Sequence, residues 1–379
     1  MIYLDNAATS FPKPMNVLKS VNNSILYFGG NPGRSGHNMS IKSSKIIYSM
    51  RQNVADFFGL DAPERVILTK NCTESLNIAI LSVMKNGGNA IISSFEHNSV
   101  LRPLEYLKEN KVCNYKVAKA SFDNPNVVLY EFEKLIDAET KMIVCTHASN
   151  VTGQIAPIDK IAELCNRRKI IFCLDASQTA GIVNISMNKQ NIDILCCPGH
   201  KALMGIRGTG LLLSKDTLHL SPIIFGGTGS SSLSLNQPDF YPDMLESGTL
   251  NVAGAASIDA GLEFIRKNDI NKIYNHEIML AKQFYNGIKN NNNVLLYSNL
   301  PEINKSVATI SFNIKGKFSS DVADILNKNK IAVRGGLHCA PLTHTFLGTK
   351  DIGTVRASFS YFNTINEIRH ACTVINNIK

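Results

Sequence analysis

The chain has 379 residues, of which 44% are hydrophobic and 18% are charged, with a net charge of +9. This composition excludes an intrinsically disordered chain and suits one large domain with a smaller domain attached. The basic residues are scattered, and the longest cluster is 167–169, so we expect a solvated basic surface and no nucleic-acid binding. No apolar stretch approaches the length of a membrane span.

The nine cysteines are an odd number and contain no C-x-x-C spacing, which argues against a disulfide framework or a metal site. Cys173, Cys196 and Cys197 lie in apolar runs and are expected to be small core residues. The first residues lack the pattern of a signal peptide. We therefore expect a reducing compartment, the cytoplasm.

Short apolar runs alternate with helical patterns between about residues 50 and 215. The runs predict strands at 66–69, 90–94, 142–146, 170–174, 192–197 and 210–214. The patterns between them predict helices that include 75–84, 101–108 and 160–167. This alternation is typical of an α/β domain with a mostly parallel, buried sheet.

The second half of the chain lacks the regular alternation of predicted strands and helices. A Gly/Ser-rich segment at 226–232 predicts an ordered loop or a flap, and a helix is expected at about 252–267. Beyond it we predict strands at 307–314 and 355–362, a helix at 319–327, and a last helix that opens with a capping box at 364–367. We place a large α/β domain at 15–262 and a smaller α+β domain at 1–14 and 263–379.

Polar groups follow five successive predicted strands, although the strands themselves are apolar. These segments are 71–75, 96–98, 147–150, 175–178 and 199–201. Ligands of such sheets bind outside the carboxyl ends of the strands. The five segments together therefore predict a binding site at that edge.

Lys201 and Asp175 each follow an apolar run, and two strands that end side by side would bring the amine and the carboxylate into one crevice. Pyridoxal phosphate (PLP) needs this pair: a lysine to hold its aldehyde as a Schiff base and an aspartate to keep its pyridine nitrogen protonated. A lysine at a strand end is more often a surface residue, but the apolar sequence around Lys201 disfavours that interpretation.

One turn and two single residues each have both a structural and a functional interpretation. The turn at 71–75 is either an ordinary helix cap or a phosphate site at a helix N-terminus. His97 is either a structural histidine or a group that stacks on a ring and moves protons. Gln178 is either a structural amide or a donor to a phenolate oxygen. Beside Lys201 and Asp175, the phosphate interpretation of 71–75 is favoured.

Cys339 lies in a segment, 334–341, whose glycine pair and proline indicate a loop, so we expect an exposed thiol. Cationic neighbours favour a thiolate nucleophile, although an adventitious thiol is the alternative. Arg356 follows a strand-like run, and its planar guanidinium suits a substrate carboxylate. A surface ion pair is the alternative for Arg356.

In their order and spacing, these residues resemble the cysteine desulfurases of the class V aminotransferase family, which have PLP fold type I. The likeness runs from the segment 3–9 to Arg356 and implies that the large domain binds PLP and that the small domain carries the Cys339 loop. By resemblance, Lys201, Asp175, Gln178 and His97 would hold the cofactor ring.

The resemblance also implies the remaining roles. Thr73 and His200 would hold the phosphate, and Cys72 would belong to the cofactor-binding residues. Thr228 would reach the phosphate of the neighbouring subunit of a homodimer. The residues that would bind the substrate are Asn150, Arg334 and Arg356. Lys201, His97 and Cys339 would be catalytic, with Cys339 as the nucleophile that takes the sulfur.

The activity implied is the conversion of L-cysteine to L-alanine, with transfer of sulfane sulfur through a Cys339 persulfide to an acceptor protein, as in sulfur mobilisation for iron–sulfur cluster assembly. Only the 16 residues 340–355 separate Cys339 from Arg356. This short segment resembles the Suf-type group, which includes selenocysteine lyase-like members.

Two residues depart from the family pattern. Cys72 stands where many members have a hydroxyl residue, and Pro198 stands where many have serine. Both changes remove a side-chain ligand of the phosphate, so the backbone N–H groups would carry more of its binding.

Three other functions stay open. The first is another PLP reaction on this fold, such as a selenocysteine lyase, another C–S lyase or an epimerase, for which a lyase would not need Cys339. The second is a nicotinamide-dependent dehydrogenase, but its G-x-G-x-x-G fingerprint does not follow the first strand. The third is a non-catalytic sulfur-relay or tRNA-binding scaffold, against which both Lys201 and Cys339 argue.

Overall fold

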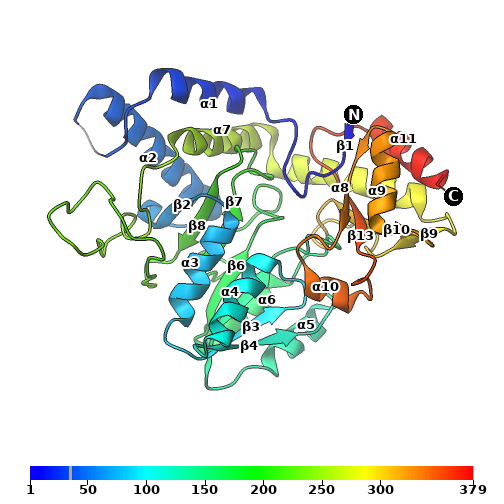
Figure 1. Ribbon diagram of the computed structural model, residues 1–379, viewed down its shortest axis with the longest axis horizontal. Coiled ribbons are helices and arrows are strands. Elements are labelled where there is room, and N and C mark those ends of the chain that lie inside the picture. The colour runs from blue at the N-terminus through cyan, green and yellow to red at the C-terminus, as the bar shows by residue number, and fades with distance from the viewer. Residues whose placement is uncertain (34–35, 379) are drawn as a thin grey trace.

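A seven-stranded sheet forms the centre of the protein in a computed structural model that describes residues 1–33 and 36–378 (Figure 1). The strand order is β2 (Val66–Thr69), β8 (Gly210–Ser214), β7 (Ile194–Pro198), β6 (Ile171–Asp175), β5 (Thr140–Thr146), β3 (Asn89–Ser93) and β4 (Asn114–Ala118). Only β8 runs antiparallel to its neighbours, so the other six strands share one direction. The prediction of a mostly parallel sheet is confirmed.

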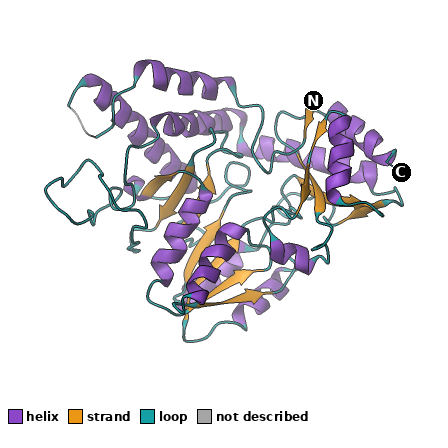
Figure 2. Ribbon diagram, in the orientation of Figure 1, coloured by secondary structure: helices purple, strands orange, loops and turns teal. Residues whose placement is uncertain are grey.

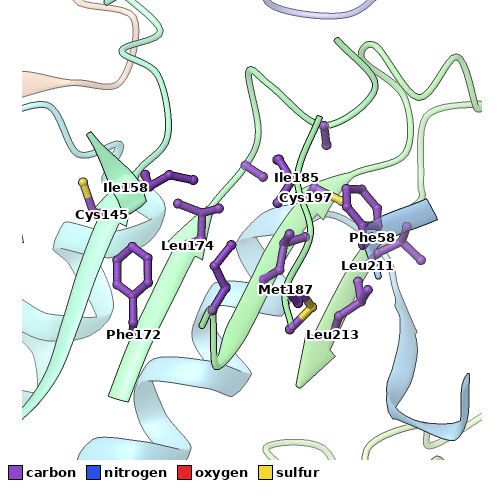
Figure 3. Packing of buried hydrophobic residues seen from close by; sticks show 14 of the residues in the cluster. Phe58, Cys145, Ile158, Phe172, Leu174, Ile185, Met187, Cys197, Leu211 and Leu213 are labelled. Carbon is purple, nitrogen blue, oxygen red and sulfur yellow. The ribbon is translucent and has the colours of Figure 1, made fainter. Parts of the chain in front are cut away.

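Both faces of this sheet are covered by helices, which explains why its strands are apolar throughout (Figure 2). Along β6, Phe172 and Leu174 enter the core cluster on one face, while Cys173 enters the cluster on the other. Figure 3 shows the first of these clusters, in which Phe172 and Leu174 pack beside residues such as Met187 and Leu213.

Each helix packs on the face of the sheet that its buried apolar residues contact. On one face lie α3 (Cys72–Met84) and α4 (Asn98–Glu109); on the other lie α2 (Asn38–Phe58), α5 (Pro125–Glu133), α6 (Ile158–Arg168) and α7 (Val252–Asn268). Helix α1 (Met15–Tyr27) packs along α7, and a short 3-10 helix, η1 (Pro63–Arg65), precedes β2.

A second core lies toward the C-terminus. The strands β9 (Val294–Leu296), β10 (Thr309–Ile314), β12 (Arg334–Gly336) and β13 (Thr354–Ser358) form a sheet of order β12-β13-β10-β9. Its helices are α8 (Ile270–Ile288), α9 (Ser319–Lys328), α10 (Pro341–Phe346) and α11 (Ile365–Asn376). Strand β1 (Ile2–Tyr3) pairs with β11 (Ile331–Ala332), which brings the N-terminus to this part of the molecule (Figure 1).

The predicted elements are present, and their ends differ by a few residues for local reasons. Helix α3 begins at Cys72 because the Asn71 side chain accepts from the N–H of Glu74. Helix α4 likewise begins at Asn98 because His97 caps it. The last predicted strand, 355–362, was too long: β13 ends at Ser358, and turns follow.

The capping box at the start of α11 is confirmed. The division of the chain into a large domain at 15–262 and a small one at 1–14 and 263–379 stays a prediction. Among residues 1–33 and 36–378, no helix is long and apolar enough to cross a membrane.

The core predicts the effect of a large-to-small substitution. Phe172 is fully buried in the central cluster. We expect Phe172→Ala to lower the free energy of unfolding by about 3–5 kcal/mol. The loss has two parts that add: the transfer free energy of the removed ring atoms and the cost of the cavity that they leave. Urea unfolding measures this change. The matched control is Tyr106→Ala on the exposed side of α4, which should stay within about 0.5 kcal/mol of wild type; equal losses in both variants would contradict the assigned core.

Candidate active site

A cavity of about 220 Å³ lies at the carboxyl edge of the central sheet. Because six strands run the same way, the residues after β2, β3, β5, β6 and β7 meet there. The cavity contains ten of the twelve predicted site residues: Cys72, Thr73, His97, Asn150, Asp175, Gln178, His200, Lys201, Arg334 and Arg356. The other two, Cys339 and Thr228, lie outside this lining.

Lys201 follows β7 on a turn that requires small residues. A Cβ on Gly199 would collide with the side chain of Thr209, so the chain turns closely here. The carbonyl of Lys201 accepts hydrogen bonds from the Ser10 hydroxyl and the Met204 N–H, which fixes the main chain. Burial, and secondly the charge of Arg356, lower the pKa of the Lys201 amine to about 8. The amine is therefore closer to its nucleophilic form than an exposed lysine.

Asp175 is the last residue of β6 and is 2% exposed. Its Oδ1 accepts from the Ser177 N–H at 2.9 Å and from the Cys72 thiol at 3.7 Å. The Cys72 thiol in turn accepts from the Ser177 hydroxyl at 3.2 Å. Burial raises the pKa of Cys72 well above its usual value, which keeps the thiol protonated and able to donate to Asp175.

The N-terminus of α3 points its first turn at the cavity. Asn71 caps the helix by accepting from the Glu74 N–H, and the Glu74 side chain accepts from the Lys70 N–H. The remaining N–H groups of the first turn and the positive end of the helix dipole lie at the cavity wall. The helix sits directly on β8, because a Cβ on Gly210 would collide with the main chain of Asn71. Such a terminus suits an anion. Beside it, the Thr73 and Ser99 hydroxyls are 2.7 Å apart.

Two histidines in the cavity are neutral near pH 7. Burial lowers the pKa of His97 to about 4, against the opposing charge of Asp175. Its Nδ1 accepts from the Ser99 N–H at 3.1 Å, so the cap also orients the ring. Burial, and secondly Lys201, lower the pKa of His200 to about 4, and its Nδ1 lies 3.1 Å from the Thr9 hydroxyl.

Arg356 on β13 reaches the cavity from the small sheet and is 1% exposed. Its Nη2 donates to Asp5 at 2.9 Å, and its Nη1 donates to the Asn150 carbonyl at 3.0 Å. Burial lowers the pKa of Arg356, and the Asp5 carboxylate opposes that effect. Among the described residues, the buried Nε–H has no hydrogen-bond partner, so this donor remains for another acceptor.

Cys339 lies beside the cavity in a strained turn and is half-buried, where we had expected an exposed thiol. His338 and Cys339 both have positive φ, 49° and 57°, which costs about 1–2 kcal/mol per non-glycine residue. Their carbonyls are held by the Asn150 side chain at 2.8 Å and by the Asn98 N–H at 2.7 Å. The Arg334 guanidinium is 3.7 Å from the Cys339 sulfur.

Some predicted residues make contacts other than the expected ones. Gln178 donates to the Ala7 carbonyl at 3.2 Å, and Asn150 donates to the loop of Cys339. Thr228 lies in a separate cavity beside α2, where its hydroxyl is 3.1 Å from that of Ser230.

Sequence reasoning missed several residues that shape the site. They are Ala7, Ala8, Ser99, Ser177 and His338 in the cavity lining, and Asp5 behind Arg356. Ser177 stands inside the predicted segment 175–178, and His338 precedes Cys339, so adjacency was an available signal for both. Asp5 has no such signal, because its partner is 351 residues away.

Comparison with known proteins places the whole chain in one group. The family model described as aminotransferase class-V matches residues 2–370. A probable cysteine desulfurase of Pyrococcus abyssi is 32% identical, and the match covers 97% of this chain and 92% of that protein. A second one, from Methanothermobacter thermautotrophicus, is 28% identical over the same shares.

A solved structure agrees in fold along nearly the full length. The apo structure of a cysteine desulfurase from Thermococcus onnurineus superimposes with a TM-score of 0.91 at 30% identity, and the match covers 99% of this chain and 94% of that one.

The position of Lys201 predicts how its amine titrates. Because burial lowers its pKa to about 8, we expect labelling of Lys201 by acetic anhydride in the cofactor-free protein to rise through pH about 8. Below that pH the amine is protonated and unreactive. Peptide mass spectrometry across a pH series gives the midpoint, and Lys201→Arg identifies the peptide. A midpoint near 10.4, the value of an exposed lysine, would contradict the buried setting.

Proposed function

The chain belongs to the aminotransferase class-V family, and on that premise we propose that it is a PLP-dependent cysteine desulfurase. The observation that carries the proposal is one cavity that combines Lys201, Asp175 and a helix N-terminus, with the Cys339 sulfur beside the Arg334 that lines it. The cysteine desulfurases among its relatives support the same activity.

The donor set of the cavity fits PLP. The Lys201 amine suits the aldehyde, the Asp175 carboxylate suits a protonated pyridine nitrogen, and the first turn of α3 suits the phosphate. The neutral His97 ring supplies a flat face, and Thr73 and His200 supply polar contacts. When bound, PLP supplies an electron sink that makes the Cα–H bond of an amino acid acidic.

The thiol at position 72 offers the phosphate no hydroxyl ligand. The thiol contacts Asp175, so we propose that Cys72 positions the carboxylate that serves the ring nitrogen. With Pro198 also lacking a side-chain donor, phosphate binding rests on the N–H groups of α3.

We propose that Arg356 and Arg334 bind the substrate carboxylate, with Asn150 beside them. The unpartnered Nε–H of Arg356 and the two guanidinium charges favour an amino-acid substrate with a free carboxylate. Asp5 holds the guanidinium in place before the substrate arrives. Lys201, as a neutral amine, takes the proton from Cα of L-cysteine.

The sulfur then passes to Cys339. The Cys339 thiolate attacks the substrate sulfur; an S–S bond forms and the Cβ–S bond breaks. The electron pair of the broken bond stays with the substrate carbon, which takes a proton and leaves as L-alanine. The persulfide sulfur passes to a thiol of an acceptor. Because the carbonyls of His338 and Cys339 are anchored, the acceptor must approach Cys339, which favours a dedicated acceptor protein.

We further propose a homodimer that works in the cytoplasm. The loop between β8 and α7 projects from the body beside α2 and carries the fully exposed Leu233 and Leu235 (Figure 1). Tyr48 on α2, an exposed apolar side chain, lines one cavity with Thr228 of this loop, and Ile25 and Leu26 on α1 are also exposed. In the dimer, Thr228 of this loop would reach the phosphate site of the other subunit. Nine free cysteines support a reducing compartment.

The role of Cys339 has a direct test. We expect the PLP-loaded protein to release L-alanine from L-cysteine with reductant, and Cys339→Ala to lose this activity by about 10²-fold or more, because the nucleophile is gone. Without reductant, mass spectrometry should find one added sulfur atom on Cys339. Cys113→Ala, a buried thiol away from the site, is the control. Equal alanine release by wild type and Cys339→Ala would favour a lyase that acts on selenocysteine or another substrate.

The dimer has a separate test. Leu233→Asp with Leu235→Asp should weaken self-association by about tenfold or more, because two charges replace apolar side chains that the proposed dimer would bury. Sedimentation velocity over a concentration series measures the dissociation constant. Leu300→Asp, at an exposed apolar residue on the C-terminal side of the chain, is the control. A wild-type protein that stays monomeric at every concentration would exclude the dimer.

A further inference from the structure

A second cavity begins at Lys201 and extends away from the candidate active site. We call it the junction cavity, because it lies between the turn after β7, α8 and the segment 358–360. It shares four residues with the active-site cavity: Ala7, Ser177, Gln178 and Lys201. Its volume is about 30 Å³, more than the ~10–15 Å³ that one buried water needs.

Two buried polar atoms of this cavity have no hydrogen-bond partner among residues 1–33 and 36–378. Glu277 on α8 is 2% exposed; its Oε1 accepts from the Tyr361 N–H at 3.0 Å, but its Oε2 accepts no hydrogen bond. The Ser360 hydroxyl is 3% exposed and is also unpartnered. Buried polar groups are almost always satisfied, and a polar cavity of this size satisfies them with water.

Glu277 and Lys201 are the only ionisable side chains among the described residues that line the junction cavity. The rest of its polar lining consists of hydroxyl and amide groups, such as Ser10, Gln178 and Thr309. Outside the lining lies Tyr274 on the same helix. Burial, and to a lesser extent the nearby Glu277, raise the pKa of Tyr274 to about 12, and its hydroxyl donates to the Ser306 carbonyl. Among the residues that the structure describes, no cation compensates Glu277 directly.

We propose that the junction cavity holds ordered water, and that through this water Glu277 exchanges protons with Lys201 from the side opposite the substrate. In one transfer the Lys201 ammonium gives a proton to a cavity water, and that water gives a proton to the Glu277 carboxylate. The products are a neutral amine and a neutral carboxylic acid. The reverse transfer restores both charges. The inference rests on the proposed function, in which Lys201 moves the substrate proton.

The two groups are matched for such a transfer. Burial raises the pKa of Glu277 to about 8, while burial and Arg356 lower that of Lys201 to about 8. Both shifts bring the two pKa values toward each other, which lowers the cost in free energy of moving a proton between the groups. Without this path, the Lys201 ammonium keeps the hydrogen it has taken as one of its three and can return it to the same molecule.

The isotope content of the product tests the path. In ordinary water, the PLP-loaded enzyme is given L-cysteine deuterated at Cα, and deuterium in the L-alanine is measured by mass spectrometry. We expect wild type to lose nearly all of the label. Glu277→Gln keeps the acceptor for Tyr361 but cannot take a proton, so exchange should slow about tenfold or more. Deuterium retention should then rise toward the share set by one deuteron among the three hydrogens of the Lys201 ammonium. Glu277→Asp should restore exchange in part, and Glu302→Gln, on an exposed loop, should match wild type.

A second measurement does not depend on turnover. Infrared difference spectra of the cofactor-free protein should show a carboxylic acid that titrates near pH 8 and is absent in Glu277→Gln. Because burial also raises the pKa of Glu96 to about 8, Glu96→Gln identifies the other band. A crystal structure should show water bonded to Glu277 Oε2 and to the Ser360 hydroxyl.

The outcomes separate the two proposals. Alanine with unchanged deuterium retention in Glu277→Gln overturns the exchange path and leaves the desulfurase standing. A Glu277 carboxyl that does not titrate near pH 8, or a dry cavity, also overturns it. No alanine from wild type removes the desulfurase, and with it the exchange role of Glu277, even if the infrared band is found.

Discussion

The candidate site depends on holding an amine and a carboxylate out of water at the ends of two adjacent strands. Lys201 follows β7 and Asp175 ends β6, and the pairing of these strands sets their separation. Burying either charge alone costs several kcal/mol. Hydrogen bonds from Ser177 and Cys72 stabilise the carboxylate. The lowered pKa of the Lys201 amine reduces the cost of its burial, because more of the amine is uncharged. The rest of the cavity follows from this pair, because the strands that carry it are buried on both faces and cannot shift.

The sequence predicted the parts of the site that follow from strand order. Apolar runs identify the strands, and parallel strands end together, so Lys201, Asp175 and the turn at 71–75 are found without coordinates. Local sequence also singled out Arg356 and Cys339, and the resemblance assigned their roles in the reaction. Their supports were out of reach, because Asp5, Asn98 and the side-chain contact of Asn150 depend on how the two sheets pack. Such contacts join residues with no periodic or local relation, and no pattern in a single chain encodes them.

The ionisable groups on the two sides of Lys201 differ. The active-site side has two guanidinium groups, and its histidines are neutral because burial lowers their pKa values. The junction side has one carboxyl group with a raised pKa. The two guanidinium groups suit a carboxylate on one side of Lys201, while the only ionisable partner on the described lining of the other side is a carboxyl group. The left-handed backbone at His338 and Cys339 adds rigidity, since strain of this kind persists only where neighbouring contacts hold it.

The ion pair between Asp5 and Arg356 joins two residues that lie 351 positions apart in the chain. During synthesis on a ribosome, Asp5 emerges long before Arg356, and β1 can pair with β11 only after β11 has emerged. All seven strands of the central sheet have emerged with β8, but Arg356 on β13 lines the active-site cavity from the small sheet. The cavity is therefore complete only after β13 has been made, long after the strands that carry Lys201 and Asp175.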